Sequence, residues 1–129
     1  ASGDMSYAMK IAHCVGPDFA LYSGNDDITL PLMSIGGSGV ISVFANVMPG
    51  MCRQIVADYA GGNQARALEN HLKYLKLMNG LFIEVNPIPV KAAMNLLGLD
   101  AGPLRLPLCE MSEEHLSALR DAMREVGLL

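Results

Sequence analysis

This 129-residue sequence has no long hydrophobic run and little charge. No apolar stretch approaches the roughly 18 residues of a membrane-spanning helix, which argues against a membrane protein. The N-terminal segment has neither the basic region nor the apolar core of a secretory signal. Charged residues are 17% of the chain, against about 25% in an average domain. Hydrophobic residues make up 51%, and a chain of this size buries only about two-thirds of its unfolded surface. Much of this apolar material therefore has no evident place in a single small domain.

Basic residues are scarce as well. Nine Lys and Arg against thirteen Asp and Glu give a formal net charge of -4. This balance offers no phosphate-binding patch, so nucleic acid is not an expected partner. The three cysteines, Cys14, Cys52 and Cys109, are odd in number and widely spaced. They predict reduced thiols in a cytoplasmic protein, with neither a disulfide framework nor a zinc site.

Short apolar strands alternate with amphipathic helices in the first half of the chain. The patterns predict a helix capped by Asp4 and ending near Gly16 and Pro17, strands at 19–22 and 40–44, and helices at about 28–35 and 49–60. Pro31 has to lie in about the first turn of its helix, or it kinks the helix. From Gln64 onward the patterns predict helices alone, the longest with an inward stripe of Leu68, Leu72, Leu75 and Phe82.

Two parallel strands are too few for a complete α/β protein. Such sheets have both faces covered by helices, and each strand here would present an unpaired edge. The second strand is apolar on both faces except for Ser42, as expected for a buried parallel strand. The pattern therefore indicates that strands are missing, and we expect them on the N-terminal side.

Two polar or glycine-rich segments are candidate sites. Residues 24–27 follow a strand, where α/β proteins place their active sites, so they could form a substrate loop or a divalent-cation site. A turn in which Asn25, Asp26 or Asp27 caps the next helix also explains them and is the favoured interpretation. Residues 36–39 precede a strand and lack a following Lys-Ser or Lys-Thr pair, so phosphate binding is not expected.

Pro87 and Pro89 fix their own φ angles and push the residues before them into extended geometry, which presents Asn86 rigidly at a bend. It could bind a ligand, or the segment could be a stiff helix connector; the residues alone favour neither. Lys91 could form a Schiff base, but a solvated role is favoured so early in an amphipathic helix. The histidines lack partners at metal-ligand spacing and the nine methionines fall at core spacing, so structural roles are expected for His13, His71 and His115.

The order of several segments resembles the dihydrodipicolinate synthase (4-hydroxy-tetrahydrodipicolinate synthase) family of the class I pyruvate aldolase and N-acetylneuraminate lyase superfamily. The segments are 1–4, 21–26, 36–43 with 45–46, 84–91, 104–108 and 126–129. The resemblance covers essentially the whole chain, and the run from Asn86 to Lys91 after residues 39–43 is specific to this branch.

The resemblance implies an α/β fold: the C-terminal portion of a (β/α)8 TIM barrel followed by an all-helical C-terminal domain. Residues 1–62 would be the last part of the barrel, with strands 7 and 8, and residues 63–129 the helical domain. The family condenses pyruvate with aspartate semialdehyde in lysine (diaminopimelate) biosynthesis, without a cofactor or metal. Its members are cytoplasmic and usually tetrameric, so the expected partners are a missing N-terminal half and further copies of the protein.

The same resemblance places the Schiff-base lysine two residues before Ala1, so no catalytic residue is expected on this chain and the chain alone is expected to be inactive. Gly24 would bring its backbone close to pyruvate, as a residue without Cβ allows. Ile41 would offer its carbonyl beneath the substrate, and Asn86 would lie near the entrance for the semialdehyde. Phe44 is bulkier than the residue usual there and Pro31 is atypical, so local differences are expected.

Two alternatives stay open at this point. The chain could belong to another pyruvate-dependent aldolase on the same barrel. It could also be a non-catalytic module that pairs with a partner chain through its strand edges.

Overall fold

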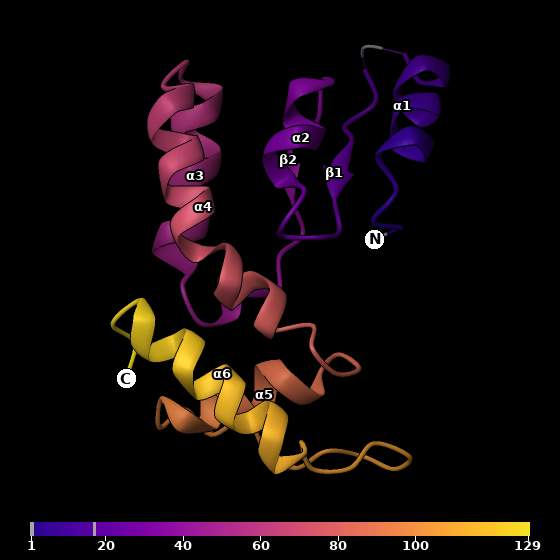
Figure 1. Ribbon diagram of the computed structural model, residues 1–129. Helices are drawn as coiled ribbons and strands as arrows, with labels where there is room; N and C mark the ends of the chain where they lie inside the picture. The colour runs from indigo at the N-terminus through magenta and orange to yellow at the C-terminus, as the bar shows by residue number, and fades with distance from the viewer. Residues whose placement is uncertain (1, 17) are drawn as a thin grey trace.

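A computed structural model describes residues 2–16 and 18–129. The helices and strands follow one another as α1 (Met5–Cys14), β1 (Tyr22–Ser23), α2 (Thr29–Ser34), β2 (Gly39–Val40), a 3-10 turn η1 (Phe44–Asn46), α3 (Pro49–Ala60), α4 (Gln64–Gly80), α5 (Ile88–Leu96) and α6 (Glu113–Glu125). Helices α3 and α4 pack side by side, and α4 continues towards α5 and α6, which form a second layer (Figure 1). The predicted order of elements is confirmed.

The sheet has two parallel strands, with Tyr22 opposite Gly39 and Ser23 opposite Val40. One backbone hydrogen bond flanks this pairing on each side, from Ser38 N to the Leu21 carbonyl and from Ile41 N to the Ser23 carbonyl. The predicted strands at 19–22 and 40–44 are wrong in extent. The second ends early because residues 42–44 turn into η1, whose N–H groups bind side chains instead of a neighbouring strand.

Helix boundaries agree best with prediction where a cap or proline marks them. Asp4 accepts a hydrogen bond from Tyr7 N at 3.0 Å and begins α1, and Ser112 caps α6. Pro49 is the first residue of α3, where its missing N–H costs nothing. Pro31 lies in the first turn of α2, as predicted. Helix α1 ends at Cys14, and Pro17 lies outside the described residues.

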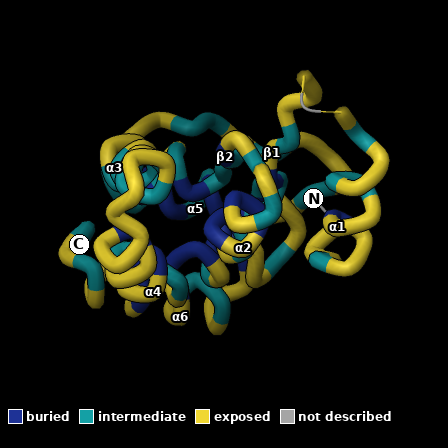
Figure 2. Tube along the Cα trace, turned by 90° about the horizontal axis from the view of Figure 1, so that it is seen from above, coloured by how far each residue is buried: buried dark blue, intermediate teal, exposed yellow. Residues whose placement is uncertain are grey.

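The core lies between α2, η1, α3, α4, α5 and α6 (Figure 2). Its largest fully buried side chains are Phe44, Leu77, Leu81, Leu119 and Met123. Helix α1 lies at the edge of the molecule and buries only Ala8 among its residues. Among the described residues, no helix is long and apolar enough to cross a membrane.

The predicted inward stripe of α4 is wrong. Leu68 and Leu72 are 51% and 57% exposed, Leu75 is half-buried, and Phe82, beyond the end of α4, is also exposed. The buried residues of the helix are instead Ala67, His71, Tyr74, Leu77 and Met78. The buried side contains two specific contacts. The Tyr74 ring lies 5.7 Å from the Phe44 ring, and the His71 imidazole contacts the Asp27 carbonyl at 2.9 Å. These partners, and not the number of leucines, determine which face of α4 packs inward.

Candidate substrate site at the strand ends

The carboxyl ends of β1 and β2 bring Gly24 and Ile41 together. Gly24 directly follows Ser23, and the Ser23 carbonyl accepts a hydrogen bond of 2.8 Å from Ile41 N. The Ile41 side chain is 72% exposed and Gly24 is half-buried. The two residues therefore lie at one open edge of the sheet, the position at which α/β proteins bind ligands.

The loop after β1 is also tied to the N-terminal segment. Ser23 Oγ donates to the Asn25 carbonyl at 2.7 Å and accepts from Asn25 N at 3.2 Å, which closes a tight turn around Gly24. The Asn25 side-chain carbonyl accepts from Gly3 N at 3.3 Å. Three separate segments, around Gly3, Gly24 and Ile41, thus meet at the same edge.

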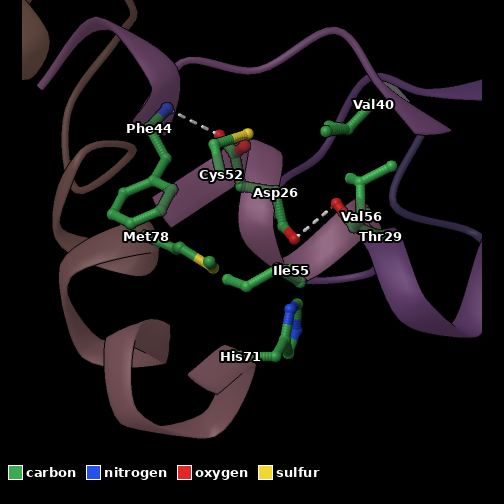
Figure 3. Close-up of a pocket in the computed structure, with 9 residues that line it drawn as sticks. All are labelled: Asp26, Thr29, Val40, Phe44, Cys52, Ile55, Val56, His71 and Met78. Atoms are coloured by element: carbon green, nitrogen blue, oxygen red, sulfur yellow. Dashed lines mark hydrogen bonds between the residues drawn. The ribbon is translucent and has the colours of Figure 1, made fainter. Parts of the chain in front are cut away.

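Asp26 links the loop after β1 to the segment after β2. Its carboxylate is buried, and Oδ2 accepts hydrogen bonds of 3.0 Å from both Val43 N and Phe44 N. Figure 3 shows the hydrogen bond from Phe44. The Asp26 carbonyl accepts from Thr29 Oγ1 at 2.8 Å. A buried carboxylate with two backbone donors is a strong, directional tie, because charged acceptors form the shorter and stronger hydrogen bonds.

This arrangement corrects the expected role of residues 25–27. Ile28 stands at the N-cap of α2 and no side chain caps that helix, so none of the three acidic or amide residues serves as its cap. Among the described residues, no group of three or more His, Cys, Asp or Glu side chains could hold a metal ion. No sequence pattern distinguishes Asp26 from Asp27, and the difference arises from the turn after β2.

A cavity of about 10 Å³, room for roughly one water molecule, lies beneath Asp26 (Figure 3). Cys52 and His71 are among its lining residues. Burial raises the pKa of the Cys52 thiol and the Asp26 carboxylate adds to this, against a hydrogen bond with Ser42. Cys52 is therefore a protonated thiol at neutral pH and not an activated nucleophile.

His71 joins α4 to the loop after β1. The imidazole is 4% exposed, and Nε2 lies 2.9 Å from the Asp27 carbonyl, so Nε2 carries the proton that is donated. This contact is structural, in line with the expectation from sequence. His13 is exposed at the end of α1, and His115 lies near Glu84 on the far side of the core.

Asn86 lies in the segment between α4 and α5, which Figure 1 shows below the strands, on the side of their carboxyl ends. Asn86 is exposed, and no hydrogen bond of the described residues joins it to Gly24 or Ile41. The connection is indirect: α5 packs against η1, which follows the Ile41 segment. The structure thus brings Gly24 and Ile41 together and places Asn86 separately.

Three of the four lysines are engaged in contacts elsewhere in the structure. Lys91 Nζ donates to the Pro103 carbonyl at 2.7 Å, and Lys76 pairs with Glu125, which raises the pKa of the Lys76 ammonium. Lys73 lies over the Tyr74 ring at 5.4 Å from its centroid. Lys10 is exposed on α1.

Phe44, the bulky residue that follows the Ile41 segment, is fully buried against Tyr74, so its ring fills the core and does not enter the open edge.

Parallel βα units with loop residues gathered at the carboxyl ends of the strands define the class of α/β proteins whose ligand sites are found at that end, here with a helical extension. The profile of the dihydrodipicolinate synthetase family matches residues 1–126. The chain therefore belongs to the dihydrodipicolinate synthetase family.

Individual relatives agree with this assignment. A 4-hydroxy-tetrahydrodipicolinate synthase from Clostridium perfringens is 49% identical over all 129 residues, which are 44% of that protein. The crystal structure of dihydrodipicolinate synthase from Thermotoga maritima matches with a TM-score of 0.95 at 43% identity, covering 100% of this chain and 45% of that one. The chloride-inhibited enzyme from Acinetobacter baumannii, crystallised with pyruvate, matches with a TM-score of 0.91 at 35% identity, covering 100% and 44%. The chain thus spans less than half the length of these relatives.

Proposed function

We propose that the complete protein containing these 129 residues is a lyase, 4-hydroxy-tetrahydrodipicolinate synthase. It condenses pyruvate with aspartate semialdehyde through a lysine Schiff base in the diaminopimelate route to lysine. The observation that carries this proposal is the meeting of Gly24 and Ile41 at the carboxyl edge of β1 and β2, within a family whose solved member from A. baumannii holds pyruvate.

In this proposal residues 1–62 are the last part of a TIM barrel, with β1 and β2 as its strands 7 and 8. Residues 63–129 are the C-terminal helical domain. Gly24 forms part of the pyruvate wall, because its missing side chain lets the substrate approach the backbone. The Ile41 carbonyl lies beneath the substrate, and Asn86 lies at the entrance for the semialdehyde.

The Schiff-base lysine comes from a segment outside these residues. The open edge fits this role, since Gly3 N binds the Asn25 side chain there and the N-terminal segment is thereby held beside Gly24. The remaining part of the barrel is then the first partner of this chain. We also propose that the complete protein is a cytoplasmic homo-oligomer, a tetramer, which sedimentation of the purified protein tests.

Borohydride reduction in the presence of pyruvate tests the chemistry. In the complete protein we expect a pyruvyl adduct on a lysine outside these residues, together with condensation of pyruvate and aspartate semialdehyde. The 129-residue chain alone should trap no adduct on Lys10, Lys73, Lys76 or Lys91. A complete protein that forms no adduct, or that condenses pyruvate only with a different aldehyde, would disprove the proposed reaction.

A further inference from the structure

Glu84 ties the segment that carries Asn86 to the beginning of α6. A single oxygen, Glu84 Oε1, accepts hydrogen bonds from Ser112 N at 3.1 Å and from Ser112 Oγ at 2.8 Å, and lies 2.8 Å from His115 Nδ1. The three donors come from residues that are 28 and 31 positions away in the sequence. This tie is therefore a tertiary contact between two elements.

The N-terminus of α6 offers hydrogen-bond donors and a favourable helix dipole to the Glu84 carboxylate. Its first N–H groups are unpaired within the helix and its dipole favours negative charge. Ser112 Oγ accepts from His115 N at 3.4 Å while it donates to Glu84, so the cap and the tie share one hydroxyl. These hydrogen bonds, that of His115 first, lower the pKa of Glu84 from its ordinary value of 4.5. Glu113 and Glu114 also lie in this first turn, but both are exposed.

The segment around Asn86 has little else to hold it. Leu81 and Ile88 are buried at its two ends, and Val85 is 67% exposed between them. After Asn86 the chain enters α5 at once, with Ile88 N donating to the Val85 carbonyl at 2.9 Å. Glu84 thus fixes the main chain two residues before Asn86, and α5 fixes it two residues after.

We propose that Glu84 is a positioning residue for Asn86, and that Ser112 and His115 at the start of α6 hold it in place. This inference rests on the proposed function, in which Asn86 lies at the entrance for the semialdehyde. Glu84 then acts on binding of the semialdehyde and not on that of pyruvate, which is bound at the separate edge formed by Gly24 and Ile41.

The test compares Glu84→Ala, Glu84→Gln and Ser112→Ala in the complete protein, with Glu113→Gln as the matched control on the neighbouring exposed carboxylate. Small misplacements of a positioned group have large kinetic effects, so we expect Glu84→Ala to raise KM for aspartate semialdehyde about tenfold. KM for pyruvate should stay within about twofold, because pyruvate is bound at the separate edge formed by Gly24 and Ile41. A general loss of structure would raise both KM values instead. Glu84→Gln keeps the size of the side chain and one acceptor oxygen, so its KM for the semialdehyde should lie between those of wild type and Glu84→Ala. Glu113→Gln should behave as wild type.

Amide hydrogen exchange in the same proteins measures the tie independently of activity. Glu84→Ala should speed exchange of the Ser112 amide, which donates to Glu84, and of the Ile88 amide, which donates to the Val85 carbonyl, and Glu113→Gln should not. Unchanged exchange, an unchanged KM for the semialdehyde, or a parallel rise of both KM values would overturn the role of Glu84. A wild-type complete protein without condensation activity would instead disprove the proposed function, and with it the substrate assigned to this tie.

Discussion

Helix α1 and the helical part from α4 to α6 have similar amphipathic sequences but very different packing. Helix α1 buries one residue, Ala8, and leaves Met9 53% exposed. Helix α6 buries Leu119, Ala122 and Met123 against its neighbours. Helix α1 is stabilised by its Asp4 cap, and the segment just before it is bound through the hydrogen bond from Gly3 N to the Asn25 side chain. Helix α6 is stabilised by packing into the core. A shared sequence pattern thus predicts a helix in both places, but only the packing partner determines its stability.

Matched methionines provide the largest contrast. Met123 is fully buried and Met9 is half exposed, so truncation removes the same atoms from two different environments. We expect Met123→Ala to lower the free energy of unfolding by about 3 kcal/mol, through lost burial and a new cavity. Met9→Ala should change it by less than about 0.5 kcal/mol. Urea unfolding of both variants checks this; similar costs would show that α1 is packed as tightly as α6.

The tie made by Asp26 is expected to rank second. Asp26→Ala leaves the N–H groups of Val43 and Phe44 without their acceptor, at a cost of about 2 kcal/mol in unfolding free energy. Asp26→Asn keeps an acceptor and should cost less. Asp27→Asn is the control, because the Asp27 side chain is exposed and its carbonyl, not its carboxylate, binds His71. Equal effects at both positions would contradict the assigned tie.

Acid should weaken the helical part through Glu84. Its pKa is lower in the folded protein than the ordinary 4.5, so the unfolded chain takes up the proton at higher pH. The stabilisation is complete above the unfolded value and is lost as pH falls from there through the folded pKa. Between pH 6 and about pH 3, the thermal unfolding temperature should therefore fall less steeply in Glu84→Gln than in wild type. Identical slopes would show that the Glu84 hydrogen bonds do not form in solution.

The smallest expected contrast concerns thiol reactivity. All three cysteines are free; Cys14 and Cys109 are exposed, whereas Cys52 is partly buried with a raised pKa. Because the thiolate is the reactive form, Cys52 should react with a disulfide reagent at neutral pH about tenfold more slowly than the other two. Mass mapping of the labelled peptides gives the three rates. A fast Cys52 would indicate that the region beneath Asp26 opens readily.

Local rules predicted much of this fold from sequence, and tertiary contacts account for the rest. Asp4 and Pro49 mark helix starts through their own side chain or backbone, and those boundaries agree with the structure. The α4 stripe was wrong because the helix has two apolar faces. Hydrophobicity favours Leu68 and Leu72, but the buried face carries His71 and Tyr74, whose partners lie far away in sequence.

The candidate site, like the fold, was predicted only in part from the sequence. Gly24 and Ile41 follow from the order of segments, and the parallel pairing of β1 and β2 does bring them together. Their roles towards pyruvate remain part of the proposed function. Asp26 and Glu84 act through contacts to backbone groups 17 or more positions away, and sequence spacing contains no information about such contacts.

A crystal structure of the complete protein with pyruvate tests the central claim most directly. The account predicts pyruvate bound covalently to a lysine from outside these 129 residues, lying against the Gly24 backbone and the Ile41 carbonyl, with the Asp26 carboxylate still bound to Val43 N and Phe44 N. Pyruvate bound away from the carboxyl ends of β1 and β2, or attached to Lys10, Lys73, Lys76 or Lys91, would contradict it.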